Sequence, residues 1–368
     1  MEIPSSHKLP LSWLYEAASL PIQYRALTEV APEAARDPER VAFLREQVLQ
    51  YKEALAVVRK QKETGLWGAN LLAPGANKAI GWKEVGTVFQ YRRLLELGLP
   101  GDLRPFRFAD RFLFRLLSRD EDPTLLVEFQ RAAKTDPGLG LWVRSMGGQA
   151  AAAALARGAH TDDPRLRGAA HRFASDISLY LRSELALKPF KKAHGKTVLD
   201  PLAYPPTVFS IETLAFMPAV QRERAAFLAR LAHYFSVPAP RRAFFIQAGK
   251  KFLKPTFEIL GDPLHADAQG RITDVPFALY WLELLARLGI LRQVPSASKV
   301  LARLYSETDD QGIWIPNGLR ALPKSPNPVV THYFPLEGAG KSPAQRQTDV
   351  TFRLGLIARL LGIPVEVV

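Results

Sequence analysis

The chain has 368 residues, and its 49 Lys and Arg against 36 Asp and Glu give a formal net charge of +13. Its hydrophobic content of 47% and charged content of 23% are typical of a globular protein, which excludes a disordered or collagen-like chain. There is no cysteine, so disulfides, thiolate zinc sites and a cysteine nucleophile are excluded as well.

Residues 1–20 do not show the pattern of a secretory signal, because Glu16 interrupts the apolar stretch and no charged region precedes a sustained apolar core. No window approaches 18 uninterrupted apolar residues, so we expect no transmembrane segment. These features favour a cytoplasmic protein.

A helix-ending pattern recurs along the whole chain. An apolar run closes on a short breaker, and a polar or Pro-containing turn leads into a second helical run. The breakers are centred on positions 30, 98, 158, 217, 289 and 362. Gly or Pro just past a helix end stops the helix, so each interval of 59 to 73 residues predicts one antiparallel helix pair. We therefore predict an all-α fold of about six helical hairpins, forming a single domain over residues 1–368.

The second helix of several hairpins is visible in the spacing of apolar residues, at 106–118, 166–181, 222–235 and 294–306. Helix starts also resemble one another. The segment Thr273–Leu279 is similar in sequence to Thr348–Leu354. Shorter similar segments are Thr87-Val88-Phe89 and Thr207-Val208-Phe209. Asp or Thr before an apolar run is a capping signal. If these starts lie at one end of a ring, they line a shared cavity.

Two segments, Glu63–Gly68 and more clearly Thr308–Trp314, are similar to the D-x-G-x-W repeat ends of the terpenoid cyclase and protein prenyltransferase superfamily. The resemblance implies an (α/α)6 toroid of inner and outer helices. The chemistry of these enzymes does not carry over, because Asp120-Glu121-Asp122 has the wrong spacing for the cyclase acid and the prenyltransferase zinc site needs a cysteine. Packing of a Trp against a neighbouring hairpin is the alternative interpretation of both segments.

The same toroid architecture occurs in six-hairpin glycoside hydrolases and in polysaccharide lyases. A hydrolase needs two carboxyl groups flanking the sugar, and Asp274 and Asp349, at matching positions 75 residues apart, are the candidate pair. A lyase needs a Tyr or His base, for which His332 and Tyr333 are available. The candidate substrate-binding residues, which stack on the ligand or neutralise its charge, are Trp82, Tyr280, Trp314 and Arg353.

Residues 315–347 form a long segment rich in Pro and Gly, which predicts a loop. A loop of about thirty residues inside a compact fold is uncommon and often functional. We expect it to line or cover the mouth of the toroid; a passive connector is the alternative.

Two basic segments contain aromatic residues. Arg241–Lys254 has five positive charges, no negative charge and three Phe, and Lys188–Lys196 is similar. Such interleaving suits contact with nucleic acid or with an anionic membrane surface. The alternative is a helix with its Phe residues in the core and its Lys residues in solvent. The candidate polyanion-binding residues are Lys191, Lys192, Arg241, Arg242, Lys250, Lys251 and Lys254.

The histidines form no metal-binding motif, and Asp262, His265 and Asp267 are equally well explained as a turn. We expect no metal site and no cofactor. The leading hypothesis is a cavity-containing helical protein, ligand-binding or enzymatic, that acts on a bulky apolar (terpenoid-like) or glycan-like substrate. The alternative is a non-catalytic helical-repeat module that binds nucleic acid or another polyanion through its basic patches.

Overall fold

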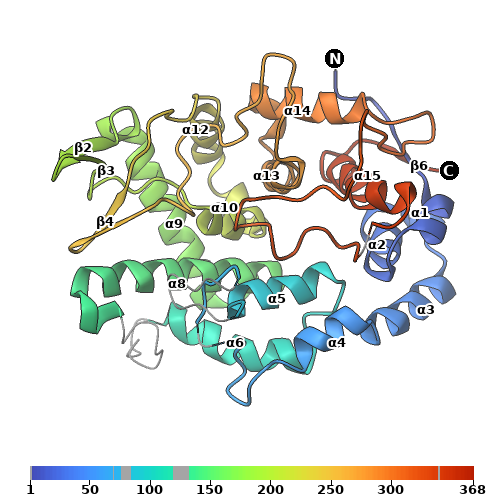
Figure 1. Ribbon diagram of the computed structural model, residues 1–368, viewed down its shortest axis with the longest axis horizontal. Helices are drawn as coiled ribbons and strands as arrows, with labels where there is room; N and C mark the ends of the chain where they lie inside the picture. Colours follow the sequence, from blue (N-terminus) through green and yellow to red (C-terminus); the bar gives the residue numbers. More distant parts are fainter. Residues whose placement is uncertain (1, 69, 76–83, 119–131, 339) are drawn as a thin grey trace. The chain divides into compact units, whose positions relative to one another are not determined.

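The computed structural model describes residues 2–368 apart from 69, 76–83, 119–131 and 339. Among these residues the protein is mainly α-helical, with three small two-stranded sheets (Figure 1). The chain divides into two compact units. Unit 1 comprises Met1–Arg59, Arg93–Pro100 and Leu264–Val368, and unit 2 comprises Lys60–Arg92 and Gly101–Pro263. No described helix is both long and apolar enough to cross a bilayer.

Unit 1 combines four helices from its N-terminal segment with three from its C-terminal segment. Its helices are α1 (Leu11–Ala17), α2 (Leu20–Arg25), α3 (Pro38–Leu49), α4 (Lys52–Val58), α13 (Val275–Arg287), α14 (Pro295–Tyr305) and α15 (Pro343–Leu360). Strand β1 (His7–Leu9) pairs in parallel with β6 (Val365–Val367) near the two ends of the chain.

The core of unit 1 is built on α13 and α15, which pack against each other. Every residue of α13 from Pro276 to Ala286 is buried, and so is every residue of α15 from Thr348 to Ala358. A helix that is buried on all sides is a core element, whereas the neighbouring α14 buries one face only. The predicted helix at 294–306 is confirmed.

Helix α15 begins earlier than its sequence suggests. Ser342 and Gln345 form a reciprocal capping box, and Pro343 occupies the first turn. Asp349 therefore lies inside α15 and is not a helix-start residue, unlike Asp274, which caps α13. The equivalence of these two positions, drawn from the repeated Thr-Asp-Val motif, is wrong.

Unit 2 contains the longest helix of the described chain. Its helices are α5 (Thr87–Glu96, whose last residues belong to unit 1), α6 (Arg104–Leu117), α8 (Pro137–Arg157), α9 (Pro164–Arg182), α10 (Val208–Ala215), α11 (Pro218–Arg222) and α12 (Ala225–Phe235). The predicted helices at 106–118, 166–181 and 222–235 are confirmed within a few residues. Helix α8 contacts α6, α9 and α10, and its residues Ala150–Ala156 are all buried. Small side chains there allow the neighbouring helices to approach closely.

Two antiparallel hairpins complete unit 2: β2 (Phe190–Ala193) with β3 (Lys196–Leu199), and β4 (Ile246–Ala248) with β5 (Lys251–Leu253). The turns place His194, Gly195 and Gly249 at positive φ, which suits a tight hairpin and ends any helix. The helical interpretation of residues 241–254 is therefore wrong. The hairpins are joined, because the amide of Leu199 donates to the carbonyl of Phe245 at 2.8 Å.

The two segments that resemble cyclase repeat ends share one local structure. In each, a Gly at φ +86° precedes a buried Trp by two residues: Gly65 and Trp67, and Gly312 and Trp314. The amide of each Trp donates to a threonine hydroxyl on a helix, Thr87 of α5 for Trp67 and Thr351 of α15 for Trp314, at 3.0 Å in both cases. Thus the motif packs each Trp against a helix of its own unit.

The Pro- and Gly-rich segment has no helix or strand among its described residues from 315 to 342, and its last five residues belong to α15. It packs against the core through buried apolar side chains, Val329, Val330, Phe334 and Leu336. Glu337 accepts hydrogen bonds from the amide of Ser19 and the hydroxyl of Thr348. The segment is therefore a well-packed part of unit 1.

Candidate functional site

A pocket of about 650 Å³ opens in unit 2, where the first turn of α10 meets the N-terminal half of α8. Its walls come from α6, α8, α9, β4 and the segment before α10. The apolar lining includes Leu116, Leu141, Trp142, Met146, Phe173, Ile177, Tyr204 and Ile246. The polar lining includes Arg144, Gln149, Arg172, Asp176, Thr207, Ser210 and Glu258. Apolar walls with a few converging polar groups are typical of a small-molecule site.

The start of α10 is held by a capping box between Thr207 and Ser210. The Thr207 hydroxyl also donates to the Gln149 side chain of α8 at 2.5 Å. Alongside, the amide of Val208 donates to the carbonyl of Phe257, and Thr207 forms a β-bridge with Glu258. These bonds bring residues that are about 50 to 110 positions apart in the sequence to one wall of the pocket.

Glu258 is a carboxyl of this wall whose pKa is shifted. Burial raises the pKa of its carboxyl, and this effect is opposed by hydrogen bonds from nearby backbone amides and from the Trp142 side chain. The amides of Thr256 and Phe257 both donate to its Oε2 at 3.2 Å. A carboxyl with a raised pKa retains its proton closer to neutral pH and can then donate it.

Asp176 is a second carboxyl in the pocket, and it lies on the exposed side of α9. Partial burial raises the pKa of Asp176, and the Arg172 guanidinium one turn earlier acts in the opposite direction. The lining thus holds a half-buried Glu258, an exposed Asp176 and a third carboxyl, Asp200, which accepts the amide of Leu202. None of the three was singled out in the sequence, because nothing local marks a Glu at position 258 as a neighbour of the Thr207 helix start.

The predicted catalytic residue Asp274 has a structural role. Its Oδ1 accepts the amide of Phe277 at 3.0 Å in the first turn of α13. Its Oδ2 accepts the hydroxyl of Ser325 at 2.6 Å and so attaches the long loop to that helix start. Both oxygens are therefore occupied, and Asp274 does not line the α8–α10 pocket.

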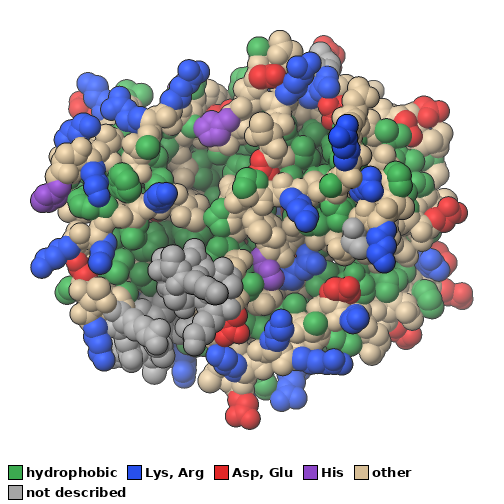
Figure 2. Space-filling view, viewed as in Figure 1, with side chains coloured by type: hydrophobic (Ala, Val, Ile, Leu, Met, Phe, Trp, Pro, Cys, Tyr) green, Lys and Arg blue, Asp and Glu red, His purple; other side chains and the backbone are tan. Residues whose placement is uncertain are grey.

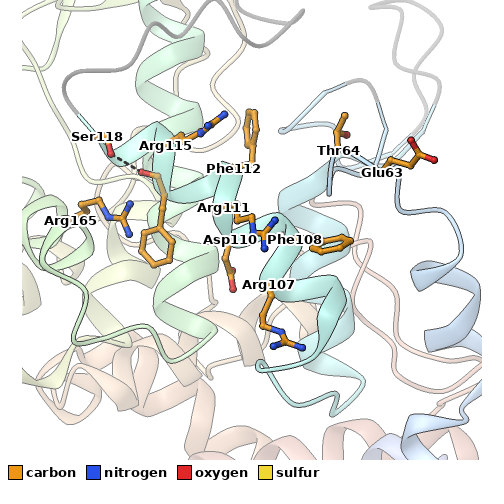
Figure 3. Close-up of a pocket in the computed structure, with 11 residues that line it drawn as sticks. Glu63, Thr64, Arg107, Phe108, Asp110, Arg111, Phe112, Arg115, Ser118 and Arg165 are labelled. Atoms are coloured by element: carbon orange, nitrogen blue, oxygen red, sulfur yellow. Dashed lines mark hydrogen bonds between the residues drawn. The ribbon is translucent and has the colours of Figure 1, made fainter.

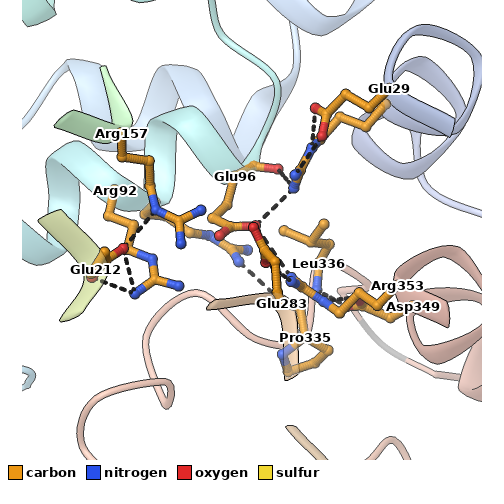
Figure 4. A network of polar contacts seen from close by, with 12 residues as sticks. Glu29, Arg92, Glu96, Arg157, Glu212, Glu283, Pro335, Leu336, Asp349 and Arg353 are labelled. Carbon is orange, nitrogen blue, oxygen red and sulfur yellow. Dashed lines mark hydrogen bonds and ion pairs between the residues drawn. The ribbon is translucent and has the colours of Figure 1, made fainter. Parts of the chain in front are cut away.

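Asp349 and Arg353 belong to a buried ion-pair network in unit 1 (Figure 4). Asp349 is 1% exposed and accepts Arg353 Nε at 2.9 Å and the amide of Leu336. Arg353 continues to Glu96 at 3.3 Å, and Glu96 binds Arg25 at 2.7 Å. The charged groups of Asp349 and Arg353 therefore pair with each other and with Glu96 in the core of unit 1. This pairing stabilises the core and does not require a ligand.

The aromatic candidates are also packed into the core. Tyr280, Tyr333 and Trp314 are buried, and the Trp314 indole N–H donates to Glu307 at 3.1 Å. His332 is half-buried in the long loop. Trp82 and the Asp120–Asp122 turn lie outside the described residues. The predicted catalytic and substrate-binding residues that the structure describes therefore belong to unit 1, and none of them lines the α8–α10 pocket.

The predicted polyanion-binding residues come together. Lys191 and Lys192 lie on β2, Lys250 lies in the β4–β5 turn and Lys251 begins β5. All seven candidates are exposed. We call the seven, with Lys196 of β3, the basic hairpin surface. Figure 2 shows Lys and Arg side chains gathered over the elements that carry β2, β3 and β4. Nearly all of the net charge of +13 falls within unit 2, while unit 1 is close to neutral.

Aromatic rings support this surface from within. Phe190 and Phe244 lie 4.9 Å apart between ring centres, which joins β2 to the segment before β4. The Lys196 ammonium lies 5.1 Å from the Phe245 ring and 4.7 Å from the Phe252 ring. These distances are those of cation–π contacts, so two of the rings are covered by a lysine.

A second cavity of about 710 Å³ follows the outer face of α6 (Figure 3). Arg107, Arg111 and Arg115 project from this face one turn apart, and Arg111 lies 5.6 Å from the centre of the Phe108 ring. Arg165, at its edge, is paired with Asp163 at 2.8 Å. We interpret this groove as the solvated face of an amphipathic helix with its rings shielded by arginine.

Within the described ranges, no group of three or more His, Cys, Asp or Glu is arranged to hold a metal ion. Comparison with known proteins finds no family model, no curated protein and no solved structure that matches this chain. The two features of unit 2 that could bind a ligand are the α8–α10 pocket and the basic hairpin surface.

Proposed function

We propose that the helical hairpins of this chain form one α/α toroid of about six repeats, as the cyclase resemblance implies. The support is local: two Gly-x-Trp segments far apart in sequence share the same backbone geometry and the same threonine contact. Wholly buried helices such as α13, next to one-sided helices such as α14, fit inner and outer positions.

Within this fold, the α8–α10 pocket is a binding site for a glycan-like ligand. The observation that carries the proposal is Glu258, a carboxyl of raised pKa in an aromatic-walled pocket that also contains Asp176. Protonated Glu258 donates a hydrogen bond to a ligand oxygen, and Trp142 and Tyr204 provide apolar faces for a sugar ring. If the bound glycan is hydrolysed, these two carboxyls are the acid and the base that the reaction needs.

A glycan fits this pocket better than a terpenoid-like ligand does. Ten polar side chains, Ser145, Asp200 and Gln247 among them, belong to its lining, and a purely apolar ligand would deprive them of water without replacing it. A ligand rich in hydroxyl groups satisfies them. The bulky apolar substrate that the sequence suggested is therefore the less favoured ligand class. An apolar ligand must still be included in the binding test for comparison.

The test measures binding of neutral and acidic mono- and oligosaccharides and of a prenyl alcohol. Binding is monitored by the fluorescence of Trp142, and a Trp142→Phe variant shows which part of the signal comes from this residue. Saccharide binding should weaken as the pH rises through the raised pKa of Glu258. Glu258→Gln should remove this pH dependence, because its amide donates at every pH. Glu184→Gln, at an exposed carboxyl of unit 2, is the control.

Thr207→Ala provides a second probe of the pocket. It removes the hydroxyl that binds Gln149 and should weaken saccharide binding about tenfold, while the lost cap costs about 1 kcal/mol of stability. Ser342→Ala removes the corresponding cap of α15 at a similar cost and should leave binding unchanged. The glycan site would be contradicted if the protein bound the prenyl alcohol more tightly than the saccharides. It would also be contradicted if Thr207→Ala, Ser342→Ala and the wild type bound saccharides equally well.

A second candidate function, binding of a polyanion, is favoured by one observation: two basic segments about 50 residues apart in sequence converge on adjoining hairpins. The test is retention on heparin and on single-stranded DNA at increasing salt, because contacts with anionic groups weaken steeply with ionic strength. Reversing the charges of Lys250, Lys251 and Lys254 should abolish retention. Unchanged retention would remove the basic hairpin surface as the binding site.

A further inference from the structure

The α8–α10 pocket and the basic hairpin surface are built on the same strands. Leu199, at the end of β3, and Ile246 and Gln247, on β4, line the pocket. Lys196 lies three residues before Leu199, and Lys250 follows β4 at its turn. Because the rise along a strand is about 3.3 Å per residue, the nearest lysines of the surface are within roughly 10–15 Å of the pocket along the chain.

The charges of the surface are available to an outside partner. Lys191, Lys251 and Lys254 are exposed, and none has a carboxylate partner in the part of the chain that the structure describes. Asp136 accepts the backbone amides of Lys250 and Gly138, and its charge also interacts with that of Lys250. Lys250 thus lies near one carboxylate, whereas the charges of Lys191, Lys251 and Lys254 remain available to an anionic partner.

The interior of the pocket has a different character. Its lining combines both signs of charge, because Arg144 and Arg172 lie at the same walls as Asp176 and Glu258. Nucleic-acid surfaces also present free aromatic rings on which bases stack. Here Phe245 and Phe252 are covered by Lys196, and Phe190 and Phe244 contact each other. The covered rings disfavour base stacking and therefore a nucleic acid. The polar pocket and the exposed lysines beside it suit a chain of hydroxyl-rich rings with carboxylate or sulfate substituents.

We propose that the pocket and the basic hairpin surface form one extended site for an anionic polysaccharide. One sugar unit occupies the α8–α10 pocket, and the acidic units next to it lie along β3, β4 and the β4–β5 turn, where lysines pair with their charges. This inference rests on the proposed glycan function and adds the class of polymer and the direction in which it leaves the pocket.

The experiment compares galacturonic acid, a series of oligogalacturonates, neutral malto-oligosaccharides of equal length and single-stranded DNA, with Trp142 fluorescence and calorimetry on the full chain. Oligogalacturonates should bind at least tenfold more tightly than the single sugar acid, and this gain should fall with salt. The triple variant Lys250→Glu, Lys251→Glu, Lys254→Glu should lose the gain and retain binding of the single sugar.

A matched control reverses three exposed lysines of unit 1, Lys52, Lys299 and Lys341, which gives the same net charge and should leave the gain intact. Oligomers that bind no better than the single sugar would overturn the extended site while leaving the pocket in place. If no saccharide changes Trp142 fluorescence, the proposed function itself fails. DNA binding that is lost in the triple variant without any Trp142 signal would assign the basic hairpin surface to nucleic acid.

Discussion

Glu96 is buried and Glu258 is half-buried, and the surroundings of these two acidic residues give them different roles. Glu96 is 1% exposed and faces two guanidinium groups, those of Arg25 and Arg353, so its charge is compensated within the core of unit 1. Glu258 receives hydrogen bonds from backbone amides and an indole but has no cation among these partners, and burial raises its pKa. An uncompensated carboxyl is the one available for chemistry.

Stability should depend on pH through Glu258. Because its pKa is raised in the folded state, the native protein binds this proton more tightly than the unfolded chain does. The stabilising contribution is present below the unfolded pKa of Glu and is lost as the pH rises through the raised value. Glu258→Gln should therefore melt at a higher temperature than wild type at pH 8, and the difference should vanish near pH 4. A constant difference at all pH values would contradict the raised pKa.

The network around Glu96 should be costly to break. Glu96→Gln leaves Arg25 and Arg353 facing each other without the shared carboxylate, and loss of one partner from a buried pair typically costs about 3–5 kcal/mol. Arg303→Gln disrupts the Arg303–Glu307 pair of α14, which is partly exposed, and should cost about 0.3–0.5 kcal/mol. Urea denaturation of both variants measures the contrast, and equal losses would show that burial does not set the strength of these pairs.

At the scale of elements, helices were predictable because their signals are local. Breakers such as Gly98, Gly289 and Gly362 lie at positive φ just past helix ends, as the sequence indicated. The hairpins were not predictable in the same way. Residues 241–254 combine Phe and Lys in an order that fits an amphipathic helix, and only the pairing of β4 with β5 and of Leu199 with Phe245 makes the extended conformation favourable.

The Gly-x-Trp motif depends on its glycine. At Gly312, φ is +86° and an added Cβ would overlap the carbonyl oxygen of Lys8, so Gly312→Ala combines backbone strain with a clash and should cost more than about 2 kcal/mol. Gly318 has a similar φ of +79° but open space around it, so Gly318→Ala should cost only about 1 kcal/mol. Thermal melts of the two variants separate the clash from the conformational strain, and equal melting temperatures would argue against a tight fit at Lys8.

At the scale of the whole molecule, the two ends of the chain meet in unit 1, where β1 pairs with β6. The amide of His7 donates to Pro364 at 2.9 Å and that of Val368 to Leu9 at 3.0 Å. Deleting residues 364–368 removes both bonds and uncovers β1, so it should cost at least about 2 kcal/mol, at about 1 kcal/mol per bond. Glu366→Gln, at an exposed position of β6, should be neutral. A deletion as stable as wild type would show that this pairing is dispensable.

By itself, the sequence determined where most helices lie, that the fold is mainly α-helical, and that positive charge and aromatic residues concentrate in two segments. Caps, breakers and the 3.6-residue period act over a few positions, so they can be recognised without knowing the rest of the fold. Tertiary structure alone decided the rest. It assigned Asp349 and Arg353 to a buried network, joined the two basic segments through β3 and Phe245, and placed Glu258 beside Thr207 and Trp142. These outcomes depend on contacts between residues tens to hundreds of positions apart, whose energies come from packing and desolvation and leave no local pattern in the chain.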